Sequence, residues 1–220
     1  ATYLHNGKPK KLLFDINKFS KFKDKIIYIV VDKQPPDIEK INKNDSVKNI
    51  NAKTQSNAYK RHIHQLEETR LGIFDADPND IIIVNDLDEI PNLEKVDFKK
   101  IKQKLIFFKQ KMFYYKLNLH YKMPWYGSRA CKKKHLESAQ WIQWIKNKKY
   151  PLWRLDTLFS KKKYHDIHFI ADGGWHFTNI KSPEDIEKKL KSFVHYKDFE
   201  SSGMNISDLK KLMNEKIKRS

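Results

Sequence analysis

Three carboxylates stand close together in one short segment of the chain. Asp86, Asp88 and Glu89 follow the apolar run Ile81–Val84 and precede Pro91. Such crowding of like charges is unfavourable without a cation. Hard oxygen ligands suit Mg²⁺ or Mn²⁺, and either ion can carry a diphosphate. The pattern therefore predicts that Asp86 and Asp88 bind a metal ion together with a nucleotide, and that Glu89 supports them.

The position of this cluster is more informative than its composition, because Asp-x-Asp alone is common by chance. Carboxylates at the carboxyl ends of strands lie where open α/β sheets bind their ligands. The sequence contains neither a P-loop nor a Gly-x-Gly-x-x-Gly segment. We therefore expect phosphate binding to depend on a metal ion and on side chains.

A second group of polar residues lies far along the chain, in the segment Asp172–Phe177. Here Asp172 and His176 stand beside two glycines, which allow a backbone to approach a ligand closely. The segment is typical of a site loop. A β-turn with Trp175 and Phe177 in the core is the structural alternative.

The segment Trp125–Arg129 combines an aromatic platform with a cation. Trp125 and Tyr126 suit stacking on a sugar ring, and the Arg129 guanidinium suits a phosphate. A packed loop would have the same composition, so both interpretations stay open here.

Secondary-structure patterns predict how these residues are positioned. A β-branched strand at 25–32, a helix at 54–74 capped by Thr54 or Ser56, and a buried central strand at 81–84 form a right-handed crossover with parallel strands. This is the unit of α/β folds. Further along, we expect strands at 105–108, 112–117 and 167–171, a loop at 124–127, and helices at 134–146, 183–195 and 207–218.

Composition indicates a folded chain with an affinity for anions. The 220 residues are 39% hydrophobic and 13% aromatic, which favours one sizeable core and a single domain. The formal net charge is +18, with lysine runs at 132–134 and 161–163. A positive surface attracts nucleotide phosphates, acidic glycans, nucleic acids and anionic membranes. Lysine-biased codon usage on solvated faces would give the same charge.

The single cysteine, Cys131, excludes an intramolecular disulfide and favours a reducing compartment. The sequence has no apolar run of the roughly 20 residues that a membrane-spanning helix needs. Together with the positive charge, this suggests a cytoplasmic protein that is peripheral to a membrane. The opening residues lack a Met and suggest that an N-terminal strand is missing.

Four segments together resemble glycosyltransferase family 17, the bisecting N-acetylglucosaminyltransferases. Asp80–Pro91 is similar to the family's most specific motif, Asp-Asp-Ile-x-(apolar)-x-Asp-x-Asp-Glu-Ile-Pro. The other pieces are Asn6–Phe14, Tyr126–Gly127, and Asp172–Thr178 with the helix start at 182–184. They occur in the family's order and cover the chain from Asn6 to about Phe199, while the last twenty residues carry no resemblance.

The resemblance implies a GT-A-like nucleotide-sugar-binding fold, with a mixed, mostly parallel central sheet flanked by helices. It implies a single domain over residues 1–220 that lacks its first strand and ends in a peripheral helix at 200–220. The implied activity is inverting transfer of N-acetylglucosamine, or a related sugar, from a UDP-sugar to a glycan, with Mn²⁺ or Mg²⁺. The positive charge suggests that this glycan acceptor is acidic or membrane-associated. The implied roles are metal binding by Asp86, Asp88 and His176; donor binding by Asp86, Asp88, Arg129, Trp125 and Trp175; and base catalysis by Asp172 or Glu89.

Two other functional classes fit parts of the sequence. Lysine runs with interleaved Tyr and Phe are typical of nucleic-acid binding, although the sequence contains no recognised nucleic-acid module. The acidic triplet also suits a metal-dependent nucleotidyltransferase or phosphodiesterase. Product analysis with UDP-sugars and a salt series with nucleic acid separate these alternatives.

Overall fold

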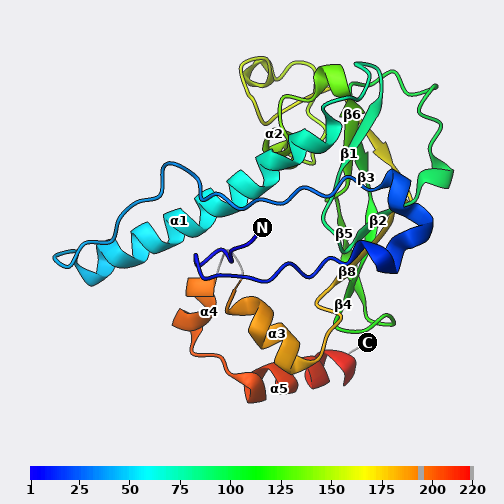
Figure 1. Cartoon of the computed structure of the whole chain (residues 1–220). Helices are drawn as coiled ribbons and strands as arrows, with labels where there is room; N and C mark the ends of the chain where they lie inside the picture. Colours follow the sequence, from blue (N-terminus) through cyan, green and yellow to red (C-terminus); the bar gives the residue numbers. More distant parts are fainter. Residues whose placement is uncertain (193–195, 219–220) are drawn as a thin grey trace. The chain divides into compact units, whose positions relative to one another are not determined.

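The computed structural model describes residues 1–192 and 196–218 and shows a mixed α/β protein (Figure 1). The chain packs as two compact units, residues 1–74 with 183–210 and residues 75–182 with 211–220. Each unit is described by itself. The single glycosyltransferase domain expected from the sequence stays a prediction.

The second unit contains two four-stranded sheets. The first has the order β1 (Ile81–Val84), β6 (Arg129–Lys132), β3 (Leu105–Phe108) and β7 (Ile167–Ile170). The second has the order β2 (Glu89–Pro91), β8 (Gly174–Thr178), β4 (Gln110–Tyr114) and β5 (His120–Trp125). The predicted strands at 81–84, 105–108 and 167–171 are confirmed, and the strand expected at 112–117 begins and ends earlier.

The expectation of a mostly parallel sheet is wrong. Only β3–β7 and β4–β8 are parallel pairs, and the other strand pairs of both sheets are antiparallel. The predicted crossover does not form, because residues 26–32 join no sheet and leave Ile27 and Val30 exposed. β1 consequently lies at the edge of its sheet and is half-buried, where the sequence predicted a central strand.

The first sheet is buried on both faces, as the alternation along β3 shows. Leu105 and Phe107 pack with Cys131 and with Ile142 of α2 (Ala139–Trp144) on one face. Ile106 and Phe108 pack on the other face with residues of β1 and of the 96–101 segment. Successive side chains of a strand point to opposite faces, so four consecutive buried residues require cover on both sides. Because both faces of the sheet are packed, its strands are held in place, and so are the polar residues that follow β1 and β7.

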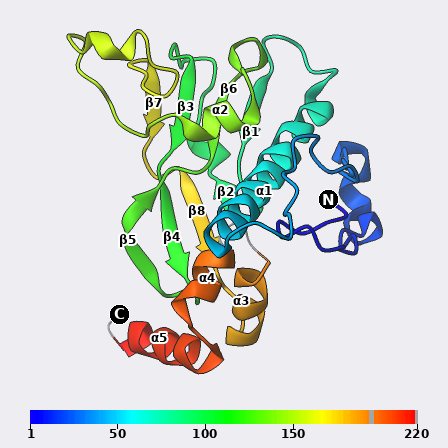
Figure 2. The same cartoon turned by 90° about the vertical axis from the view of Figure 1, so that its left-hand side faces the viewer.

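Most connections between consecutive strands cross from one sheet to the other, and only β4–β5 and β6–β7 stay within one sheet. β1 leads to β2, β3 to β4 through Lys109 alone, β5 to β6, and β7 to β8. Figure 2 shows β7, β3, β6 and β1 beyond the ends of β5, β4, β8 and β2. The short connections at 85–88, 126–128 and 171–173 therefore lie between two rigid sheets, and they hold the segments predicted to carry chemistry.

The helices differ from the sequence predictions mainly at their starts. The long helix α1 (Val47–Glu67) begins earlier than expected, because the Ser46 hydroxyl accepts a hydrogen bond from the Asn49 N–H. It continues into a 3₁₀ segment, η2 (Glu68–Ile73). The helix expected at 134–146 is shortened to η4 (Lys133–His135) and α2. The remaining elements are η1 (Ile16–Lys25), η3 (Leu93–Lys95), η5 (Leu155–Thr157), α3 (Pro183–Leu190), α4 (Tyr196–Ser202) and α5 (Ile206–Lys218).

The predicted C-terminal helix at 207–218 is confirmed by α5. The helix predicted at 183–195 is confirmed to Leu190, and its last three residues lie outside the described residues. Within residues 1–192 and 196–218, no helix is both long enough and apolar enough to cross a membrane.

Candidate active site

The acidic segment forms a tight turn between β1 and β2. The Asn85 side-chain amide donates hydrogen bonds to the carbonyl oxygens of Asp86 (2.8 Å) and Glu89 (3.2 Å). The Glu89 N–H donates to the Asp86 carbonyl at 3.1 Å. Asp86 and Leu87 at the crest of the turn are exposed. The turn thus presents the Asp86 carboxylate to solvent on a fixed backbone.

Glu89 faces inward and anchors this turn. Its side chain is buried and accepts hydrogen bonds from the Trp125 indole N–H (2.5 Å), the Ser128 hydroxyl (3.3 Å) and the Asp86 N–H (3.1 Å). Burial raises the pKa of the Glu89 carboxyl, and the hydrogen bond from Trp125 opposes that shift. Both carboxyl oxygens are occupied by protein donors. This geometry suits a positioning residue better than the base predicted from the sequence.

Gln110 and Ser128 extend the anchor into the protein. The Gln110 amide donates to the Ser128 hydroxyl at 3.0 Å and to the Trp175 carbonyl at 3.3 Å, and both side chains are fully buried. Sequence reasoning missed these two residues. The available signal was a glutamine at the start of a strand that follows the apolar run Leu105–Phe108. A buried amide in that setting needs polar partners.

Gly127 is required by the close approach of Glu89 and Trp125. A Cβ atom at position 127 would lie 1.6 Å from Glu89 Oε1 and 2.2 Å from Trp125 Nε1. No side chain fits there without displacing the hydrogen bond that these two residues share. The glycine of the predicted aromatic loop therefore serves the acidic turn directly.

His176 brings the second predicted motif to the same place. It lies opposite Glu89 in the antiparallel pair of β2 and β8, and its Nε2 is 3.5 Å from Asp88 Oδ1. The Trp125 ring stacks on the imidazole with centroids 4.8 Å apart. The Phe177 N–H also donates to the Asp88 carbonyl at 2.8 Å. Two motifs almost ninety residues apart in the sequence thus form one cluster.

Asp172 and Trp175 are not brought into this cluster. Asp172 precedes β8 and forms an ion pair with Lys111 at 3.2 Å. The strand from Gly174 to Phe177 spans roughly 10 Å, and it separates Asp172 from the backbone that holds Asp88. Trp175 neighbours His176 in the same strand, so its side chain points to the opposite face of the sheet. Their predicted roles as base and donor contact stay predictions that this geometry does not support.

Arg129 has a structural role in place of the predicted contact with phosphate. Its Nη1 donates to the carbonyl oxygens of Ile142, Gln143 and Ile145 at 2.7–2.8 Å, at the end of α2. Its Nε donates to the Tyr126 carbonyl at 2.9 Å, and the guanidinium lies 4.5 Å from the centroid of Phe107. Burial lowers the pKa of Arg129 to about 10. The guanidinium satisfies helix carbonyls that otherwise lack partners.

Asp86, Asp88 and His176 have side chains of the types that bind divalent metal ions. Mg²⁺ and similar ions are commonly held by one or two carboxylates together with substrate phosphates. In the part of the chain that the structure describes, no three His, Cys, Asp or Glu side chains are grouped to hold a metal ion. The buried His176 Nδ1 has no hydrogen-bond partner. The predicted three-ligand set stays a prediction, and a set completed by a diphosphate agrees better with this arrangement.

Comparison with protein-family models, curated proteins and solved structures finds no match.

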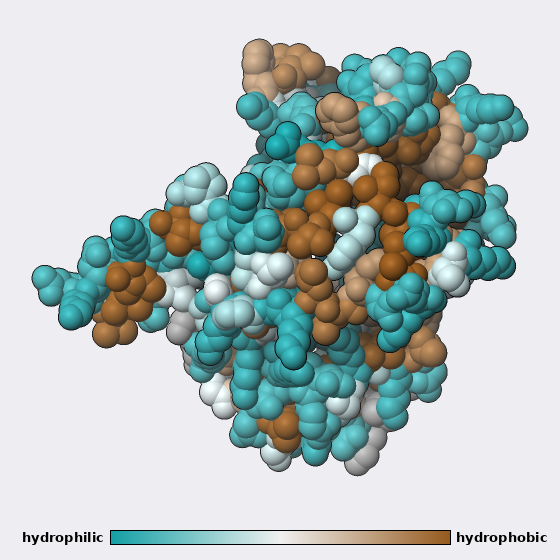
Figure 3. All heavy atoms as spheres, viewed as in Figure 1, coloured by the Kyte–Doolittle hydropathy of each residue, from teal (hydrophilic) through white to brown (hydrophobic). Residues whose placement is uncertain are grey.

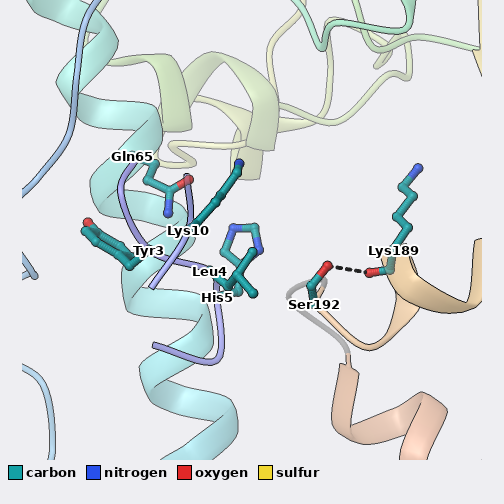
Figure 4. A pocket seen from close by; sticks show the side chains of 7 residues that line it. All are labelled: Tyr3, Leu4, His5, Lys10, Gln65, Lys189 and Ser192. Carbon is teal, nitrogen blue, oxygen red and sulfur yellow. Dashed lines mark hydrogen bonds between the residues drawn. The ribbon is translucent and has the colours of Figure 1, made fainter. Parts of the chain in front are cut away.

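Two hollows have linings that contain no residue of the acidic turn. The first unit has a cavity of about 140 Å³ lined by residues that include Tyr3, His5 and Gln65 (Figure 4). Burial lowers the pKa of His5 to about 4. The second unit has a hollow of about 300 Å³ with an apolar floor and a rim that includes Lys102 and Lys104. Both hollows lack carboxylates in their linings, so neither suits a metal ion.

Proposed function

We propose that the chain is a metal-dependent glycosyltransferase. It transfers N-acetylglucosamine, or a related sugar, from a UDP-sugar to a glycan acceptor. One observation carries the proposal: the acidic turn and the Gly-Trp-His strand lie side by side, with His176 3.5 Å from Asp88. The same two segments hold the most specific parts of the resemblance to glycosyltransferase family 17. Carboxylates beside an imidazole are suitable ligands for a divalent ion that carries a diphosphate.

In this proposal Asp86 and Asp88 hold a Mn²⁺ or Mg²⁺ ion with the diphosphate of the donor. The exposed Asp86 carboxylate and the half-buried Asp88 carboxylate leave room for substrate oxygens. His176 meets the metal or a phosphate oxygen through Nε2, and Trp125 keeps the imidazole in plane by stacking. When bound, the ion neutralises the charge that develops on the departing diphosphate.

Glu89 and its partners fix the geometry of this centre. A buried carboxylate with three hydrogen-bond donors holds the turn between β1 and β2 in one conformation. Metal-site carboxylates need such support, because a shift of about 1 Å at a reacting centre lowers rates strongly. We therefore propose a positioning role for Glu89, Ser128 and Gln110.

A direct test measures release of UDP from UDP-N-acetylglucosamine and other UDP-sugars in the presence of Mn²⁺. We expect Asp88→Asn to reduce turnover at least about a hundredfold, because it removes a charged ligand while keeping the side-chain shape. Asp97→Asn is the matched control, since Asp97 is an exposed acid of the same unit that forms an ion pair with Lys100 at 3.1 Å. Equal loss in both variants, or none in Asp88→Asn, would sink the proposal.

Product analysis decides between the reaction classes. A glycosyltransferase releases UDP and forms a glycosidic bond, whereas a phosphodiesterase or nucleotidyltransferase releases UMP or transfers a nucleotide. Release of UMP in place of UDP would contradict the proposed activity. Steeply salt-dependent nucleic-acid binding without any affinity for UDP would point to the basic-surface alternative.

A further inference from the structure

The loop between α2 and β7, residues 146–163, carries an unusual set of exposed side chains. Five large apolar residues lie within eight positions, and all are at least two-thirds exposed: Leu152 (86%), Trp153 (76%), Leu155 (68%), Leu158 (70%) and Phe159 (90%). Figure 3 shows apolar side chains at the tip where Figure 1 draws this loop. Soluble domains rarely expose so many large apolar side chains together unless something covers them.

The loop is held in shape by polar groups that point inward. Its base is closed by a hydrogen bond from the Lys146 N–H to the Lys162 carbonyl at 2.7 Å. The buried Thr157 hydroxyl contacts the Arg154 carbonyl and the His165 ring. His165 Nδ1 in turn lies 2.9 Å from the Tyr150 carbonyl. Polar groups therefore serve as the internal frame while apolar side chains face outward, the reverse of a solvated loop.

Charge surrounds the apolar tip. Between residues 146 and 163 the sequence has six lysines, one arginine and a single carboxylate, Asp156. That carboxylate is neutralised by Arg154 (2.6 Å) and Lys163 (2.7 Å), which hold its pKa well below its usual range. The Lys162 ammonium lies 4.6 Å from the centroid of Trp144 at the base of the loop. The loop thus presents excess positive charge and no unpaired acid.

We propose that the 146–163 loop docks the protein onto an anionic lipid surface. A bilayer offers both properties that this loop matches, an apolar interior and a layer of negative headgroups. Trp and Phe are favoured at that boundary, and lysine side chains keep their ammonium groups among the phosphates. An apolar protein surface would not complement the charge of the six lysines, whereas an anionic lipid surface does. Charge complementarity therefore favours the lipid. The proposal does not depend on the acidic turn.

The test is cosedimentation of the whole chain with vesicles. Vesicles of equal parts phosphatidylcholine and phosphatidylglycerol should retain the protein, and pure phosphatidylcholine should retain much less. Leu152→Ser with Phe159→Ser should lower the partition coefficient by about a hundredfold, since each buried apolar side chain contributes about tenfold. Lys148→Ala with Lys161→Ala should lower it by roughly 25-fold.

Two control variants keep the interpretation specific. Leu117→Ser removes another exposed leucine of the same unit (67%), outside the loop, and should leave vesicle binding unchanged. Lys102→Ala with Lys104→Ala removes two charges at the rim of the basic hollow and should lower binding by less than about threefold. All altered side chains are exposed, so thermal unfolding should match that of the original chain.

Three outcomes would overturn the proposal. The first is no binding to anionic vesicles by the original chain. The second is undiminished binding by the Leu152→Ser and Phe159→Ser variant. The third is that the original chain is a dimer in sedimentation equilibrium and does not bind vesicles, while this variant is a monomer. That result would assign the loop to self-association.

Discussion

Replacing Gly127 by alanine tests whether Glu89 anchors the acidic turn. The added Cβ would fall 1.6 Å from Glu89 Oε1 and 2.2 Å from Trp125 Nε1, so their 2.5 Å hydrogen bond cannot persist. Loss of a buried hydrogen bond to a carboxyl group costs about 1.5–3 kcal/mol. Displacing packed side chains adds about 1–3 kcal/mol. We expect the free energy of unfolding of the second unit to fall by about 3–5 kcal/mol in Gly127→Ala.

Urea denaturation followed by tryptophan fluorescence measures this change. The midpoint of thermal unfolding should fall by about 5–15 °C. Gly72→Ala is the matched control, because no atom lies within 4 Å of the position of its added Cβ. Alanine in that 3₁₀ segment should be neutral or slightly stabilising.

A double-mutant cycle with Glu89→Ala tests whether the contact with Glu89 causes the loss of stability in Gly127→Ala. Without the Glu89 side chain the 1.6 Å clash is absent and the hydrogen bond to Trp125 is already lost, so only the contact with Trp125 Nε1 remains. The cost of Gly127→Ala in that background should therefore fall by about 2 kcal/mol or more. A Gly127→Ala variant as stable as the original chain, or the same cost in both backgrounds, would refute the anchor.

The remaining predictions concern three side chains of the second unit. Arg129→Lys should lower the free energy of unfolding by about 2–4 kcal/mol in urea titrations, because one ammonium cannot reach both the Tyr126 carbonyl and the end of α2; unchanged stability would argue for a ligand-binding role. Asp172→Asn should retain transfer activity and change stability by less than about 1 kcal/mol, since its pair with Lys111 is exposed; loss of UDP release in a folded variant would restore Asp172 as the base. The raised pKa of Glu89 favours its protonated form in the native state, so this contribution to stability is complete below the ordinary value of 4.5 and declines as the pH rises through the raised pKa. In urea titrations across this pH range, the free energy of unfolding of Glu89→Gln should not show the decline. The same pH dependence in both proteins would contradict Glu89 as its cause.

The short apolar strands were predictable from sequence because a short apolar run between polar residues favours a strand. Ile81–Val84 and Leu105–Phe108 are such runs, and both form strands. Their pairing was not predictable. An apolar run does not reveal which neighbour it meets, so the edge position of β1 and the antiparallel pairs required the structure. The run at 25–32 shows the same limit, because it has the composition of a strand but joins neither sheet.

Within the candidate site, local patterns predicted the acidic turn and the importance of His176, but not how they are held. Glu89 and His176 are adjacent because β2 pairs with β8 in a register that places them opposite each other. This pairing joins segments almost ninety residues apart, so local patterns could not predict it. Arg129 could not be interpreted from sequence, because a cation beside aromatics has the same pattern whether it binds a phosphate or, as in this structure, the carbonyls of a helix. Gln110 carried no motif at all, and its role follows only from its burial beside Ser128.

Calorimetric titration with UDP-N-acetylglucosamine, in the presence and absence of Mn²⁺, tests the central claim most directly. The proposed site predicts saturable binding that requires Mn²⁺ and weakens at least about a hundredfold in Asp88→Asn, while Asp97→Asn binds as the original chain does. Binding that is independent of Mn²⁺ and unchanged in Asp88→Asn would contradict a metal-dependent donor site at the acidic turn.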